Sequence, residues 1–133
     1  MRFRLGWLIL LGLTGLSTAG AAASTDAVHI GATRLEPPVL YTTTERRVTF
    51  VNHSGRAVHI DFPGEAGQHH IVQVPGSIWA VFHRSGQHPY IVHFPAGGGQ
   101  DLRGVVEVEH DQERAGEPPT CTGVSVMGVC LER

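Results

Sequence analysis

Short runs of β-branched and aromatic residues, each ended by a glycine, a proline or a Ser-Gly step, punctuate most of this chain. Residues 47–52 read Arg-Val-Thr-Phe-Val-Asn and end at His53-Ser54-Gly55, and residues 70–74 end at Pro75-Gly76. Valine, isoleucine, threonine and phenylalanine favour a pleated strand, whereas glycine and proline favour turns. No competing helical period is present, so the pattern predicts strands.

About seven such runs recur between residues 28 and 109, at the spacing of roughly 8–12 residues that is typical of sandwiches and barrels. Residues 78–83 and 88–94 are separated by Arg-Ser-Gly-Gln, a connection of hairpin length. The sequence therefore predicts an all-β fold, an antiparallel Greek-key β-sandwich or barrel, in place of an α/β fold.

The N-terminus has the composition of a secretion signal. Arg2 and Arg4 precede the apolar run 5–16, which is followed by the small residues of 17–23. The run is about a dozen residues, whereas a bilayer span needs about 20. We expect residues 1–23 to be a signal peptide cleaved after Ala23, which predicts a periplasmic or secreted protein without a transmembrane segment. An uncleaved signal anchor is the alternative.

After the signal, about 110 residues remain, the size of one domain. We assign residues 24–110 to the sandwich domain and residues 111–133 to a C-terminal tail. The tail holds Cys121 and Cys130, the only cysteines of the sequence. Export places them in an oxidising compartment, which favours an intramolecular disulfide. Metal binding or thiol exchange by this pair stays open, although the C-x-x-C spacing is missing.

Charge and motifs exclude several classes of function. The chain has no lysine and a formal net charge of −2, so it lacks the basic surface that nucleic acids require. The sequence contains neither Gly-x-Ser-x-Gly nor His-Glu-x-x-His, and Ser85 and Ser125 stand alone in turn or tail context. No catalytic constellation is found, and we do not predict an enzyme.

Histidine is the unusual residue of this composition, with nine in the chain. Clustered histidines in an exported protein favour metal binding, because neutral imidazole is a common ligand of copper, zinc and nickel. The alternative is that several of them are solvated surface or strand residues.

Three motifs, in order, resemble the cupredoxin family of blue-copper β-sandwich proteins over nearly the whole mature chain. They are Leu35-x-Pro37 before Val48-Thr49-Phe50-Val51-Asn52, then Val74-Pro75-Gly76 ten residues before Gly86, and finally Leu102-x-Gly104-x-Val106-x-Val108. The order and spacing of the motifs carry the resemblance, since each is short.

The resemblance implies a copper site at one end of the sandwich, built from a histidine after the Val-x-Phe-x-Asn strand and a later cysteine, histidine and methionine. Here His59 stands for the first histidine. Val92 takes the place of the cysteine, Pro95 or a glycine that of the second histidine, and Leu102 that of the methionine. The thiolate is lost, so histidines must hold any metal, and such a set suits Cu(II), Zn(II) or Ni(II).

The first candidate metal site lies at the end of the sandwich where the family places copper. It comprises His59, His93 and also His53, which sits in the loop joining two predicted strands. Asp61, two residues after His59, shares its strand face and can orient an imidazole through the second ring nitrogen. The alternative is that His53 and His93 are solvated loop residues.

The second candidate metal site follows from strand geometry. In a hairpin around residues 84–87, His83 pairs with His88, and the Cβ atoms of such a pair are about 4.5–5.5 Å apart. His69 and His70 begin a strand that we expect to neighbour this hairpin. The alternative is a surface ladder whose register Pro89 shifts.

Three functions follow. The first is an exported protein that binds copper, or a similar divalent metal, for capture or delivery, with electron transfer suggested by family analogy alone. The second is a non-metal interaction module or accessory subunit of a cell-envelope protein complex. The third, catalysis at a histidine-ligated copper, has no supporting residues of its own.

Overall fold

The computed structural model describes residues 26–64, 69–112 and 121–131, with the backbone alone at His69 and His70. Within these ranges the chain forms the following strands: β1 (Asp26–Ile30), β2 (Leu35–Glu36), β3 (Val39–Thr43), β4 (Arg47–Asn52), β5 (Val58–Pro63), β6 (His69–Val74), β7 (Ser77–Phe82), β8 (Gly86–His93), β9 (Leu102–Glu109), β10 (Val124–Val126) and β11 (Val129–Cys130).

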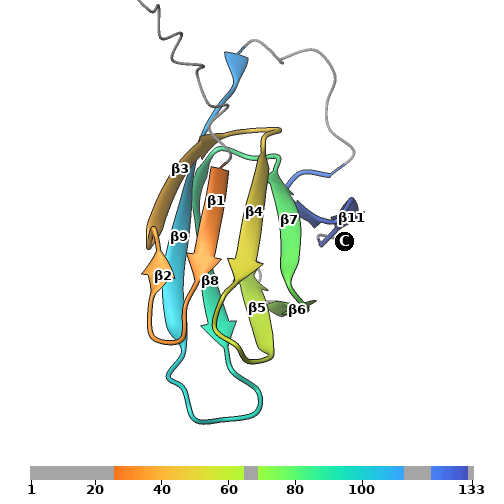
Figure 1. The fold of residues 1–133 in the computed structure, drawn as a ribbon. Helices are drawn as coiled ribbons and strands as arrows, with labels where there is room; N and C mark the ends of the chain where they lie inside the picture. Colours follow the sequence, from red (N-terminus) through yellow and green to blue (C-terminus); the bar gives the residue numbers. More distant parts are fainter. Residues whose placement is uncertain (1–25, 65–68, 113–120, 132–133) are drawn as a thin grey trace, which may run out of the picture.

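The strands form two sheets packed face to face (Figure 1). One sheet has the order β11-β10-β7-β4-β1-β2, and the other has the order β3-β9-β8-β5-β6. The predicted all-β sandwich is confirmed. Two pairings, β1 with β4 and β3 with β9, are parallel, which corrects the expectation of purely antiparallel strands. In each pair, several strands separate the two partners in sequence, and those strands are divided between the two sheets.

The predicted hairpin around residues 84–87 is wrong. β7 pairs with β4 and β10, whereas β8 pairs with β5 and β9 in the opposite sheet. Both strands bury every second side chain between the sheets. Because two strands that face each other across a core show the same alternation as two that pair, the pattern did not distinguish the arrangements.

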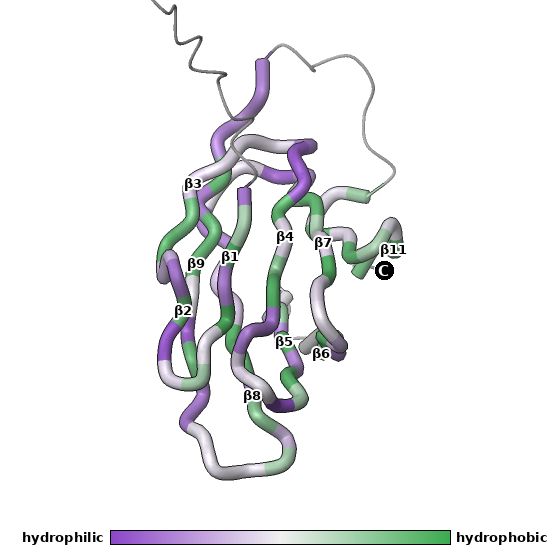
Figure 2. The backbone as a smooth tube through the Cα atoms, in the orientation of Figure 1, coloured by the Kyte–Doolittle hydropathy of each residue, from purple (hydrophilic) through white to green (hydrophobic). Residues whose placement is uncertain are grey.

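Alternating side chains fill the space between the sheets, and Figure 2 shows hydrophobic and hydrophilic residues alternating along the strands. Phe50 contacts Phe62 and Tyr90 edge-on, with ring centroids 5.9 and 5.2 Å apart. Gly104 lies opposite Tyr90 on β9, and a Cβ there would stand 2.3 Å from the phenol ring. The glycine of the third motif is therefore required by the aromatic ring that covers it.

The sheet continues past residue 110, where we expected the domain to end. β10 pairs with β7, and β10 and β11 form a hairpin whose turn residues, Met127 and Gly128, both have positive φ. Two such residues match the twist of a tight hairpin. The predicted disulfide is confirmed, since Cys121 and Cys130 are bonded.

No helix in the described ranges is long and apolar enough to cross a membrane. The predicted signal peptide, residues 1–23, lies outside the described residues and stays a prediction.

Candidate functional site

We refer to the loops 53–57 and 94–101 as the loop end of the sandwich, at the bottom of Figure 1. The two loops are in contact, because Arg56 donates a hydrogen bond of 2.9 Å from Nη1 to the carbonyl of Gly98. The guanidinium of Arg56 also lies over the ring of Phe94. The resemblance places the copper of a blue-copper protein at this end.

The interior of the loop end is hydrocarbon. Val58 and Val92 are fully buried and Phe94 is nearly so. Leu102 packs against the same cluster. Both cysteines of the sequence are in the disulfide, and the hairpin that contains it pairs with β7. These residues do not fit a blue-copper centre, which needs a thiolate and two imidazoles.

His59 and His93 instead lie on the outer face of the five-stranded sheet. They are direct partners in the antiparallel β5–β8 register. Their inward-facing neighbours, Val58 and Val92, are buried, and side chains alternate along a strand. The two histidines are therefore brought side by side, as the first candidate site requires.

Two carboxylates flank the His93 imidazole. Its Nδ1 is 2.9 Å from Asp101 Oδ1, a hydrogen-bonding distance. Its Nε2 is 3.8 Å from Asp61 Oδ2, too far for a hydrogen bond. Asp61 comes from the same strand face as His59, and its side chain is 6% exposed. Asp101 therefore orients the ring, and Nε2 faces a buried carboxylate across a gap.

This gap has a size that suits a divalent ion. Two ligands that each lie about 2.0–2.1 Å from one ion are at most about 4.2 Å apart. The 3.8 Å between His93 Nε2 and Asp61 Oδ2 is within that limit. Across the described ranges, however, no three histidine, cysteine or acidic side chains already converge on one point. A third ligand from His59 requires its side chain to turn toward the gap.

His53 does not join this group, which corrects the first candidate site. It is exposed, and its Nε2 is 2.9 Å from His29 Nδ1. The His53 amide donates to the carbonyl of Ile30, which keeps the residue beside β1 in the six-stranded sheet. Sequence reasoning missed His29 as a partner, because the parallel pairing of β1 with β4 had no signal in the chain.

His83 and His88 do not face each other, which corrects the second candidate site. His83 has both ring nitrogens engaged: Nδ1 is 2.8 Å from Glu45 Oε1 and Nε2 is 2.9 Å from Ser125 Oγ. This Ser-His-Glu order is that of a hydrolytic triad. Ser125, however, belongs to β10 of the C-terminal hairpin, and its side chain is buried. We interpret the three side chains as a connection between the hairpin and the sandwich.

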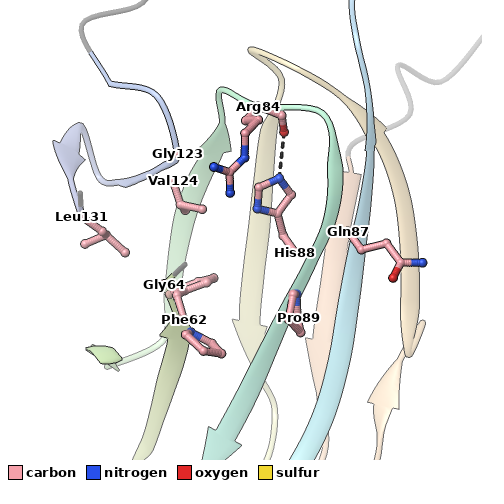
Figure 3. Close-up of a pocket in the computed structure, with 10 residues that line it drawn as sticks. Phe62, Gly64, Arg84, Gln87, His88, Pro89, Gly123, Val124 and Leu131 are labelled. Carbon is pink, nitrogen blue, oxygen red and sulfur yellow. Dashed lines mark hydrogen bonds between the residues drawn. The ribbon is translucent and has the colours of Figure 1, made fainter. Parts of the chain in front are cut away.

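His88 points inward from β8 and is buried, with Nε2 2.7 Å from the Arg84 carbonyl (Figure 3). Its ring packs against Phe82. It lines a cavity of about 270 Å³ together with Arg84, Phe62, Val124 and other residues. The C-terminal segment contributes Gly123, Val124 and Leu131 to this cavity, whereas neither His59 nor His93 lines it (Figure 3).

For His69 and His70 the structure describes only the backbone, which pairs with Pro63 and Phe62 of β5. Because β5 lies between β6 and β8, the strand that carries these histidines is a neighbour of neither β7 nor β8. The expectation that it would adjoin a β7–β8 hairpin is wrong for the same reason as the hairpin itself.

No family model and no curated protein match the chain. Among solved structures, a reduced Cu(I) form of an amicyanin variant at pH 4 is similar, with a TM-score of 0.51 and 22% identity over 68% of this chain and 88% of that chain. Amicyanin from Paracoccus versutus gives a TM-score of 0.51 at 18% identity, over 68% of this chain and 87% of its own. An oxidised amicyanin variant gives 0.52 at 21% identity, over 68% and 88% of the two chains. The chain therefore has a cupredoxin-like fold.

Proposed function

We propose that this is an exported protein that binds Cu(II), or a similar divalent ion, on the outer face of its five-stranded sheet, for metal capture or delivery. The ligands are His93, His59 and Asp61. The observation that carries the proposal is the β5–β8 register, which opposes the two histidines while carboxylates flank the His93 imidazole.

The ligand set determines the kind of metal chemistry. Imidazole and carboxylate ligands suit Cu(II), Zn(II) and Ni(II), whereas the fast electron transfer of blue-copper proteins depends on a thiolate. Asp101 would act as an outer-shell residue, since a carboxylate on the second ring nitrogen fixes the orientation of a histidine ligand and raises its basicity. Electron transfer is therefore supported by the fold alone, and reversible binding is supported by the residues.

The export that we predict agrees with this function. Both cysteines form a disulfide, a bond that persists in oxidising compartments. The predicted signal peptide points to the same location. In the periplasm or outside the cell, a half-exposed site at the sheet surface can exchange its ion with the surroundings or with an envelope protein partner.

The test is Cu(II) titration of the exported protein by calorimetry and electron paramagnetic resonance. The wild type is compared with His59→Ala/His93→Ala, and exposed His110→Ala is the matched control. We expect the double substitution to weaken binding at this site at least tenfold, and Asp101→Asn to weaken it by about 10- to 100-fold, as for other outer-shell carboxylates. If the double variant bound Cu(II) with unchanged stoichiometry and affinity, the proposed metal site would be wrong. The alternative function, a non-metal interaction module, would then be preferred.

Two further readouts characterise the site. Copper-loaded protein should lack the intense visible absorption of a thiolate–Cu(II) bond, because both sulfurs are in the disulfide. Binding should weaken as the pH falls through about 6.5, where free imidazole takes up a proton and ceases to be a ligand. A strong blue colour, or binding that persists at pH 5, would contradict a histidine-ligated centre.

A further inference from the structure

A second pair of histidines lies on the opposite sheet. His29 Nδ1 and His53 Nε2 are 2.9 Å apart, and the planes of the two rings differ by an angle of 21°. Both side chains are exposed. His29 is on β1 and His53 directly follows β4, its parallel neighbour. Two exposed imidazoles thus present their nitrogens to one another at the end of the six-stranded sheet.

The backbone holds both residues in place. The His53 amide donates 2.8 Å to the Ile30 carbonyl, one residue from His29. Asn52 closes the following loop, because its Oδ1 accepts from the Ser54 amide and hydroxyl and its Nδ2 donates to the Arg56 carbonyl. The fold therefore fixes the backbone positions of the two histidines, so only their side chains need to be ordered for them to bind a common ligand.

We propose that His29 and His53 form a second divalent-metal site, best suited to the tetragonal geometry of Cu(II). Two nitrogens that lie about 2.0–2.1 Å from one ion and meet at a right angle are about 2.9 Å apart, whereas tetrahedral ligands are about 3.4 Å apart. The observed separation matches the first value.

Binding requires no change of net protonation in the pair. In the neutral hydrogen-bonded pair, one of the facing nitrogens carries the shared proton and the other accepts it. The ion takes the place of that proton, which moves to the other nitrogen of the same ring through exchange with water. The two imidazoles then both present lone pairs to the metal, once each ring has turned from the line between the two nitrogens toward the ion.

A third ligand is within reach on the neighbouring strand. Glu36 is the direct partner of His29 in the β1–β2 register. Its carboxylate forms an ion pair of 3.5 Å with Arg34. The Arg34 side chain is 78% exposed and the Glu36 side chain is 70% exposed. An ion pair so exposed contributes little to stability, so the carboxylate can turn to a bound cation. Water would complete the coordination.

The test uses the His59→Ala/His93→Ala background, so that it succeeds or fails independently of the proposed function. In that background, Cu(II) titration should still show one equivalent whose paramagnetic resonance spectrum has coupling to two nitrogens. Adding either His29→Ala or His53→Ala should weaken this binding at least tenfold, and Glu36→Gln should weaken it by a smaller factor. Adding His110→Ala should leave it unchanged.

Two results would overturn the proposal. One is the absence of stoichiometric Cu(II) binding in the His59→Ala/His93→Ala background. The other is affinity that stays within twofold when His29 or His53 is replaced. Circular dichroism melts of each variant show whether the fold is kept; a His53→Gln variant, which retains a polar side chain in the loop, replaces His53→Ala if that variant unfolds.

Discussion

The interior of the sandwich and the outer faces of its sheets carry different kinds of residue at the loop end. The interior is closed by Val58, Val92 and Phe94, whereas the paired histidines lie outside, on both sheets. The fold is similar to that of amicyanin, and the interior of the loop end is apolar packing. The metal sites that we propose use surface residues alone, so stability and metal binding should respond to separate sets of substitutions.

The largest effect is expected in the interior, from Gly104→Ala. The added Cβ would lie 2.3 Å from the buried Tyr90 ring, which is held between Phe50 and Phe62. Overpacking of this kind costs about 1–3 kcal/mol, and we expect the upper end in urea unfolding. Gly76→Ala is the control, because a Cβ there meets nothing within 4 Å. Equal stability of both variants would show that the Tyr90 ring can move to make room for a methyl group at residue 104.

Removing the disulfide should have the next largest effect. The bond joins residues 9 apart in sequence, and loop entropy for so short a loop gives at most about 3 kcal/mol. We expect Cys121→Ser/Cys130→Ser to lower the free energy of unfolding by about 2 kcal/mol. Metal affinity at the loop end should not change, because the hairpin pairs with β7 at the opposite edge of the six-stranded sheet from β2. A loss of Cu(II) binding in this variant would show that metal binding at the loop end depends on the C-terminal hairpin.

A smaller effect of opposite sign is expected for Tyr90→Phe. The Tyr90 hydroxyl is buried and has no hydrogen-bond partner among the described residues. Removing it should raise the free energy of unfolding by about 1 kcal/mol. Exposed Tyr41→Phe is the control and should leave stability unchanged. A loss of stability in Tyr90→Phe would indicate that the hydroxyl is bonded after all.

The same residue predicts a pH dependence. Burial raises the pKa of the Tyr90 phenol well above its ordinary value. Because the folded state binds the proton more tightly, this group's contribution is complete below the unfolded pKa of about 10 and is lost as pH rises beyond it. Wild-type protein should therefore lose more stability than Tyr90→Phe between pH 8 and pH 11. If chemical denaturation showed that the free energy of unfolding falls equally with pH in both proteins, this prediction would be wrong.

The smallest effect on stability is expected on the outer face. His59→Ala/His93→Ala removes partly exposed side chains, and the pairing of His93 with half-exposed Asp101 is worth little in water. Metal-free double variant should unfold within about 1 kcal/mol of the wild type. A larger loss of stability would mean that the two histidines help to hold the fold together. The outer face would then contribute to stability as the interior does.

Local alternation was sufficient to predict most of the strands and the sandwich. Residues such as Val28, Ile30, Val48 and Phe50 alternate with polar neighbours, and each is buried. The grouping of His59 with His93 was also accessible, because the resemblance places both at the same end of the sandwich, and the structure pairs them directly. These features depend on patterns that a single strand, or a single motif, contains.

Which strands pair was less accessible. Residues 83–85 cross from one sheet to the other, although their length and composition are those of a hairpin turn. The β1–β4 neighbours, and with them His29 beside His53, are parallel and far apart in sequence, so no turn signal connects them. Cross-sheet connections are decided by packing of the whole core, which local sequence patterns do not encode.

The C-terminal hairpin has a consequence for solubility. β10 lies along the free side of β7, an apolar strand of sequence Ser-Ile-Trp-Ala-Val-Phe. Its cysteines are bonded to each other, so no disulfide joins the hairpin to the strands of the sandwich. The hairpin is held there by backbone pairing, by the Ser125–His83–Glu45 connection and by the packing of Val126 in the core. If the hairpin detached, β7 would present unpaired backbone groups to other copies of the chain. The last residues of the described chain thus protect the molecule from edge-to-edge association.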